Sequence, residues 1–130
     1  MFRDTAKAIE KLGRAGDPVT RAPFRFNAIH AIELYLNALL LHAGHDGSRI
    51  RALKHDLAAR AELASKAGLL LRQRTQAHLR SLVDTREYLV SRYAPDVTDS
   101  LSQLNRLSAT LDEVAAKVAA LASQDTPRRA

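Results

Sequence analysis

The stretch from Ala28 to Ala43 constrains the fold more than any other part of the sequence. Its apolar residues cover nearly the whole circumference of a helix, so the segment needs neighbours on every side. Several polar side chains interrupt it, and it is shorter than the roughly 20 residues that a bilayer span requires. We therefore predict a central core helix that begins near Pro23 and ends at Gly44.

In the rest of the chain, apolar residues recur at the spacing that is typical of helices. Ala, Leu and Arg dominate, and each proline lies outside the long periodic segments. Apolar spacings of three and four residues predict helices at 2–14, 56–68 and 69–93, with Asp56 as an N-cap and Gly68 as a left-handed C-terminal residue. The fold class is therefore all-α, an up-and-down bundle of about four to five helices.

The last helical segment carries a narrow apolar seam between Val97 and Leu121. This seam fits packing inside the bundle or a dimer interface, and we favour packing inside the bundle. We expect residues 1–123 to form one domain and 124–130 to be a short polar tail.

Composition indicates which class of partner and which cellular compartment to expect. The formal net charge of +6 suits a polyanionic partner, although the arginines are spread along the chain. The chain has no cysteine, and its charged N-terminus lacks the apolar stretch of a signal peptide, so we expect a cytoplasmic protein without a membrane segment. Because no Gly-rich phosphate loop is present, we expect no cofactor. We expect no metal either, since His42, His45 and Asp46 form an incomplete ligand set.

Glu33 is the most unusual residue of the central helix, because an unpaired carboxylate is costly to bury. We expect Arg86, Arg92 or His55 to be its partner. The simpler interpretation is a buried structural pair. The alternative is a polar cleft in which Glu33, Asn37 and one of those arginines bind a ligand.

Metal-free RNA cleavage needs a group that exchanges protons near neutral pH and a cation that stabilises the phosphorane. Three Arg and His pairs have a suitable spacing: Arg25 with His30, Arg49 with His55, and Arg72 with His78. We favour His55 with Arg49 as catalytic candidates and Arg51 as a phosphate contact, since a loop at a helix start suits phosphate binding. The competing interpretation is that His55 and Asp56 only begin the helix. The six aromatic residues are too few for a base-stacking platform and are assigned to the core.

One combination of motifs resembles a known family. The run AIHAIELYLNALLLHAG at 28–44 is followed by His55-Asp56-Leu57, then Gly68-Leu69, and later by Arg92-Tyr93. This order resembles the HEPN domain (higher eukaryotes and prokaryotes nucleotide-binding).

The resemblance implies an HEPN-like bundle that forms a homodimer, in a family with many metal-independent ribonucleases and toxins paired with a nucleotidyltransferase-type protein. It adds Arg86, Arg92 and Tyr93 to the ligand-binding candidates. Family nucleases usually carry an arginine followed a few residues later by a histidine on a late helix. The stretch from Arg86 to Pro95 holds no histidine, which departs from that pattern.

Three functions follow as expectations. The first is an HEPN-like module, without a clear catalytic motif, that binds a partner protein, a nucleotide or RNA. The second is a ribonuclease toxin of a toxin-antitoxin pair that uses an unusual Arg and His pair, with His55 or His78. The third is a structural helical adaptor that assembles through the final seam.

Overall fold

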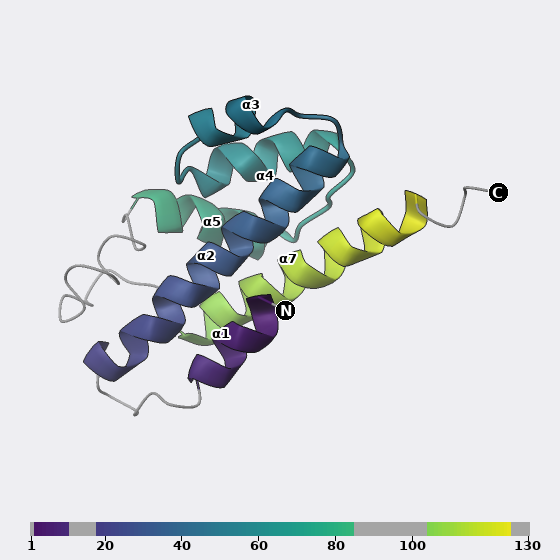
Figure 1. The fold of residues 1–130 in the computed structure, drawn as a ribbon. Helices are drawn as coiled ribbons and strands as arrows, with labels where there is room; N and C mark the ends of the chain where they lie inside the picture. The colour runs from purple at the N-terminus through teal and green to yellow at the C-terminus, as the bar shows by residue number, and fades with distance from the viewer. Residues whose placement is uncertain (1, 11–17, 85–103, 126–130) are drawn as a thin grey trace.

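The computed structural model describes residues 2–10, 18–84 and 104–125 (Figure 1). The described helices are α1 (Phe2–Glu10), α2 (Pro18–His42), α3 (Gly47–Ala52), α4 (Leu57–Lys66), α5 (Gln73–Asp84) and α7 (Leu104–Asp125). These residues contain no strand, so the all-α class is confirmed. None of the described helices combines the length and the apolar character that crossing a bilayer requires.

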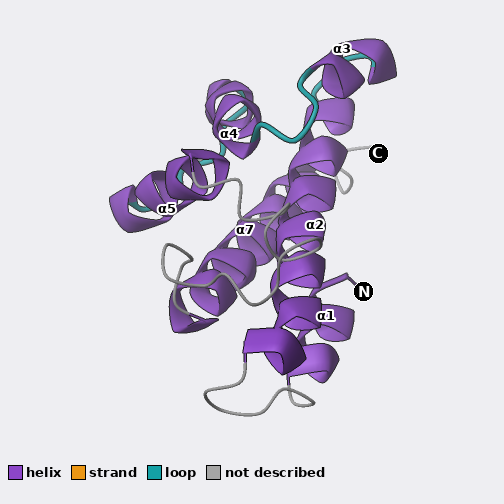
Figure 2. Cartoon of the chain, turned by 90° about the vertical axis from the view of Figure 1, so that its left-hand side faces the viewer, coloured by secondary structure: helices purple, strands orange, loops and turns teal. Residues whose placement is uncertain are grey.

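The central position predicted for α2 is confirmed. It packs against α1, α3, α4 and α7, while α5 packs against α4 and α7. Figure 2 shows α4 and α5 on one side of the molecule, with α1 and α2 opposite. The largest fully buried apolar side chains come from α2, α5, α7 and the segment before α5: Phe24, Ile32, Leu36, Leu40, Leu69, Leu79, Leu82, Leu107, Leu111 and Val114.

The predicted start of α2 near Pro23 is wrong, because the helix begins at Pro18. Proline suits the first helical position, where an amide donor has no partner within the helix. Pro23 then lies inside the helix, where its ring removes one backbone hydrogen bond but does not end the helix.

Both predicted caps around α4 are confirmed. The Asp56 carboxylate accepts the Ala59 amide at 2.9 Å, and Gly68 has a φ of +105°. The Gly68 amide donates to the Ser65 carbonyl, and the Leu69 amide donates to the Ala64 carbonyl, which is the Schellman pattern. Leu69 is therefore drawn into the core as the apolar residue that follows this cap. For that reason the next helix begins at Gln73, and the start predicted at Leu69 is wrong.

A carboxylate from another helix caps α5. Glu113 of α7 accepts the Arg72 amide at 2.8 Å, the Thr75 hydroxyl at 2.5 Å and the Lys117 ammonium at 2.9 Å. Burial alone would raise the pKa of Glu113, but these hydrogen bonds and the Lys117 charge outweigh it and lower the pKa to about 2. This contact joins the start of α5 to the middle of α7.

The seam on α7 packs inside the described bundle. Leu107, Leu111, Val114 and Val118 are all buried, and α7 packs mainly on α2. Val97 lies outside the described residues. The helix continues to Asp125, past the domain boundary predicted at residue 123.

Candidate functional site

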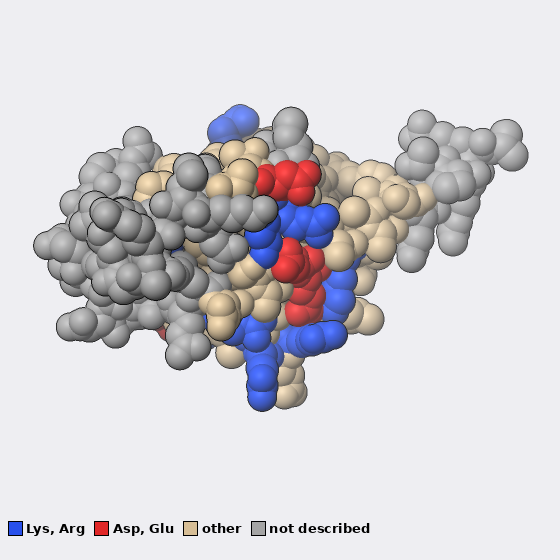
Figure 3. Space-filling view, turned by 90° about the horizontal axis from the view of Figure 1, so that it is seen from below, with Lys and Arg blue, Asp and Glu red and all other residues tan. Residues whose placement is uncertain are grey.

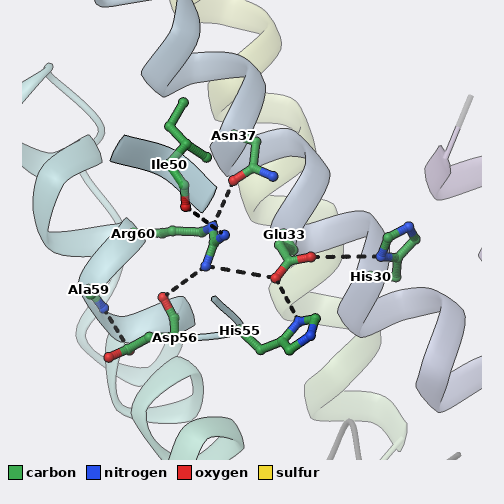
Figure 4. Close-up of polar contacts among 8 residues, drawn as sticks. All are labelled: His30, Glu33, Asn37, Ile50, His55, Asp56, Ala59 and Arg60. Carbon is green, nitrogen blue, oxygen red and sulfur yellow. Dashed lines mark hydrogen bonds and ion pairs between the residues drawn. The ribbon is translucent and has the colours of Figure 1, made fainter. Parts of the chain in front are cut away.

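Glu33 lies on the core helix α2 and is surrounded by nitrogen atoms (Figure 4). Its side chain is 11% exposed. His55 Nδ1 lies 3.1 Å from Oε1, Arg60 Nη1 lies 3.7 Å from the same oxygen, and His30 Nδ1 lies 3.8 Å from Oε2. One nearly buried carboxylate thus faces three nitrogen-bearing side chains.

Arg60 is the buried partner of this carboxylate. Its side chain is only 3% exposed, and its Nε donates to Asn37 Oδ1 at 2.7 Å. Its Nη1 donates to the Asp56 carbonyl and its Nη2 to the Ile50 carbonyl, both at 3.4 Å. Burial lowers the pKa of Arg60, and the charges of Glu33 and Asp56 oppose that effect. Because an arginine in a protein keeps its proton, this is a buried ion pair that links α2, α3 and the start of α4.

Sequence analysis missed Arg60, although a signal was present. The buried residues of α4 are Leu57, Arg60 and Ala64, at helical spacing on one face. A charged residue on the core-facing stripe of a short helix must have a buried partner of opposite charge. The single carboxylate on the apolar face of α2 is that partner.

The two histidines differ from Arg60 in their exposure. The His55 side chain is 58% exposed and the His30 side chain 54% exposed, so both reach solvent from a nearly buried anchor. Each approaches Glu33 through Nδ1. Only the His55 contact is a hydrogen bond; in the tautomer that donates this Nδ1 proton to Glu33, the imidazole has Nε2 as its acceptor atom on the far side of the ring. Figure 4 shows the two rings at different oxygens of the Glu33 carboxylate.

A tight turn between α3 and α4 places His55. Lys54 has a φ of 52°, in the left-handed region that residues with a Cβ rarely adopt. The Lys54 amide donates to the Arg51 carbonyl, and the Asp56 amide donates to the Leu53 carbonyl. His55 immediately precedes the Asp56 N-cap, so the cap that starts α4 also fixes the position of the imidazole.

Arg49, the predicted catalytic arginine, and Arg51, the predicted phosphate contact, lie on the short helix α3. Arg49 and Arg51 are exposed, while Ile50 between them is buried and holds the helix on the core. The Ile50 carbonyl also accepts from Arg60, which ties α3 to the Glu33 cluster. The structure therefore joins Glu33 to Asn37 through Arg60, joins His55 to Glu33 directly, and places Arg49 and Arg51 on an adjoining helix. Arg86, Arg92 and Tyr93 lie outside the described residues.

His78, the alternative nuclease histidine, is buried between α5 and α7. It is 6% exposed, and its Nδ1 lies 2.6 Å from the Thr110 hydroxyl. Burial, with a smaller contribution from the Arg106 charge, lowers the pKa of His78 to about 4. A neutral, buried imidazole is poorly placed to meet an RNA substrate, so His55 is the better candidate.

Among the described residues, no group of three or more acidic or histidine side chains is arranged to hold a metal ion. Asp46 instead caps α3 through the Arg49 amide and also accepts from Ser48. Comparison of the chain with protein-family models, with curated proteins and with solved structures finds no match. The assignment of function therefore depends on the residues of the site.

Proposed function

We propose that this protein is an HEPN-like helical module that binds RNA through the surface formed by His30, His55 and the exposed arginines of α3. One observation carries the proposal: a nearly buried carboxylate, itself held by Arg60, contacts two exposed imidazoles, and one of them, His55, follows the short helix that carries the exposed Arg49 and Arg51. A cluster that served only to stabilise the fold would not need solvent-exposed rings.

The charge on α3 is available to a phosphate backbone. Arg49 and Arg51 are both exposed, and no ion pair within 4 Å joins either to another described residue, although the Arg49 charge contributes to lowering the pKa of Asp46. Arginine binds phosphate through two parallel N–H donors, and each phosphate neutralised releases counterions from the nucleic acid. By contrast, the face in Figure 3, seen from below in the orientation of Figure 1, interleaves blue and red side chains. The described residues of that face therefore offer no surface of one sign, which favours α3 as the place for phosphate.

The experiment is an RNA titration followed by fluorescence anisotropy at several salt concentrations. The test variant is Arg49→Glu with Arg51→Glu, and the matched control is Arg74→Glu with Arg80→Glu on α5, which changes the net charge equally at two exposed positions. We expect the α3 variant to lose about tenfold or more in affinity with a shallower salt dependence, and the α5 variant to change much less. Equal losses in the two variants, or no binding by the wild type, would contradict the proposal.

A second candidate function rests on a separate observation, the 3.1 Å contact between Glu33 Oε1 and His55 Nδ1. A carboxylate that orients an imidazole prepares it for proton transfer. His55 Nε2 would take the proton of a 2′-hydroxyl, whose oxygen attacks the adjacent phosphorus. The bond to the 5′-oxygen would then break, water would protonate that oxygen, and Arg49 would stabilise the phosphorane. The products are a 2′,3′-cyclic phosphate and a 5′-hydroxyl.

Induced expression separates the two candidates. RNA degradation and poor growth with the wild type, both relieved by His55→Ala but not by His42→Ala, would establish the ribonuclease. His42 is a suitable control because it is also an exposed histidine, at the end of α2 and away from the Glu33 contacts. Intact RNA and normal growth for all three proteins would favour the binding module.

A further inference from the structure

Phe26 and His30 form a parallel aromatic pair on α2. They lie one helical turn apart, with ring centroids 6.2 Å apart and planes inclined by 8°. This offset-stacked geometry is within the range that aromatic pairs prefer. Phe26 is half-buried, whereas more than half of the His30 side chain is exposed. The exposed imidazole is therefore supported by an apolar ring rather than surrounded by water.

Two contacts restrict the orientation of the His30 ring. Phe26 lies parallel to it, and Glu33 Oε2 lies 3.8 Å from its Nδ1. Glu33 is itself restrained by His55 and Arg60. A flat ring whose rotation is already limited loses little conformational entropy when a ligand stacks on it. The sequence does not show this pair, because the spacing of four residues between Phe26 and His30 does not fix the rotamers that make their rings parallel.

We infer that His30, backed by Phe26, is a base-stacking subsite, and that the RNA bound by this protein is therefore single-stranded. The inference rests on the proposed function and adds the class of RNA. Every base has a face that can stack on an aromatic or imidazole ring, and in a duplex those faces are already covered. His55 contacts the other oxygen of the same carboxylate, Oε1, and lies in the turn between α3 and α4 (Figure 4). An unpaired nucleotide can thus place its base on His30 and its phosphate toward His55, in the turn that follows α3.

The test compares a single-stranded RNA with a duplex of the same length, using wild type, His30→Ala, His30→Phe and the control His42→Ala. We expect His30→Ala to weaken single-strand binding about tenfold, in the range measured for removal of one stacking side chain, with little effect on the duplex. His30→Phe should keep single-strand affinity because it keeps a stacking surface. His42→Ala should change neither affinity.

A second readout does not depend on the folding of a variant. With 2-aminopurine in the single strand, wild-type protein should quench the fluorescence of the stacked base. Three outcomes would overturn the stacking subsite while leaving RNA binding intact. His30→Ala could lose affinity equally for the single strand and the duplex, or His30→Phe could lose as much single-strand affinity as His30→Ala. The third outcome is that wild-type protein does not quench the 2-aminopurine fluorescence. No binding of either RNA by wild type would overturn the proposed function and this inference together.

Discussion

The cap that Glu113 provides for α5 makes a quantitative prediction about stability. Its pKa is lowered from 4.5 to about 2, so the folded protein binds this proton far more weakly than the unfolded chain does. A shift of that size corresponds to about 3 kcal/mol of stability at neutral pH. Because the ammonium of Lys117 is 39% exposed, solvent screens part of the interaction, and we expect about 1 to 2 kcal/mol.

The sign follows from the direction of the shift. A carboxylate with a depressed pKa in the folded state stabilises the fold above its unfolded pKa of 4.5, and that stability is lost as the pH falls from 4.5 toward about 2. Glu113→Gln should therefore cost about 1 to 2 kcal/mol at neutral pH and flatten this acid-dependent loss. Glu113→Ala should cost more, about 2 to 4 kcal/mol, because the buried Thr75 hydroxyl and the Arg72 amide both lose their acceptor.

Urea denaturation followed by far-UV circular dichroism, from neutral pH down to about pH 3, measures both effects. Glu62→Gln is the matched control, because Glu62 is an exposed glutamate on α4 and should change stability by less than about 0.5 kcal/mol. If Glu113→Gln were as stable as wild type at neutral pH and lost stability equally steeply in acid, the trans-helix cap would not be the source of the low pKa.

Three further predictions use the same measurement. Burial lowers the pKa of His78 to about 4, so on acidification the unfolded chain binds this proton before the folded protein does, and the free energy of unfolding should fall as the pH drops from 6.5 to about 4. The variant His78→Gln should lack this pH-dependent loss of stability. If the loss persisted in the variant, His78 would not be its source. Arg60→Ala should cost about 3 to 5 kcal/mol, because it leaves the Glu33 charge without its buried partner, and a loss under 1 kcal/mol would refute the buried pair. Lys54→Gly should be at least as stable as wild type, whereas Lys54→Val should lose about 1 kcal/mol or more, since a β-branched side chain fits a φ of 52° poorly.

Local signals in the sequence predicted much of the fold. The apolar circumference of 28–43 predicted the central helix, and Asp56 and Gly68 marked the two ends of α4 because caps depend on neighbouring residues. The Glu113 cap joins residues far apart in sequence, and periodicity holds no information about such a pairing. The start of α5 was placed too early for a related reason, since Leu69 is apolar as part of a loop that closes over the core.

The sequence predicted part of the candidate site, as it predicted part of the fold. The cost of burying a carboxylate indicated that Glu33 needs a partner, and His55 was among those considered. Arg60 was missed because helical spacing alone does not show which neighbouring helix faces an arginine. The parallel rings of Phe26 and His30 depend on side-chain rotamers, which the residue types do not determine.

The free-energy cost of burying the ion pair of Glu33 and Arg60 indicates what the pair is for. Desolvating two charges is expensive, and apolar residues of similar volume often replace such a pair with no loss of stability or with a gain. If the pair served only the fold, Glu33→Leu with Arg60→Met would be as good a solution. What apolar residues cannot do is hold His30 and His55 at the surface by their Nδ1 atoms. We therefore expect this double variant to fold with stability close to wild type and to lose RNA affinity about tenfold or more, since both rings lose their anchor. Urea denaturation and anisotropy on the same preparation would show it, and full RNA affinity in a stably folded double variant would mean that the cluster is structural.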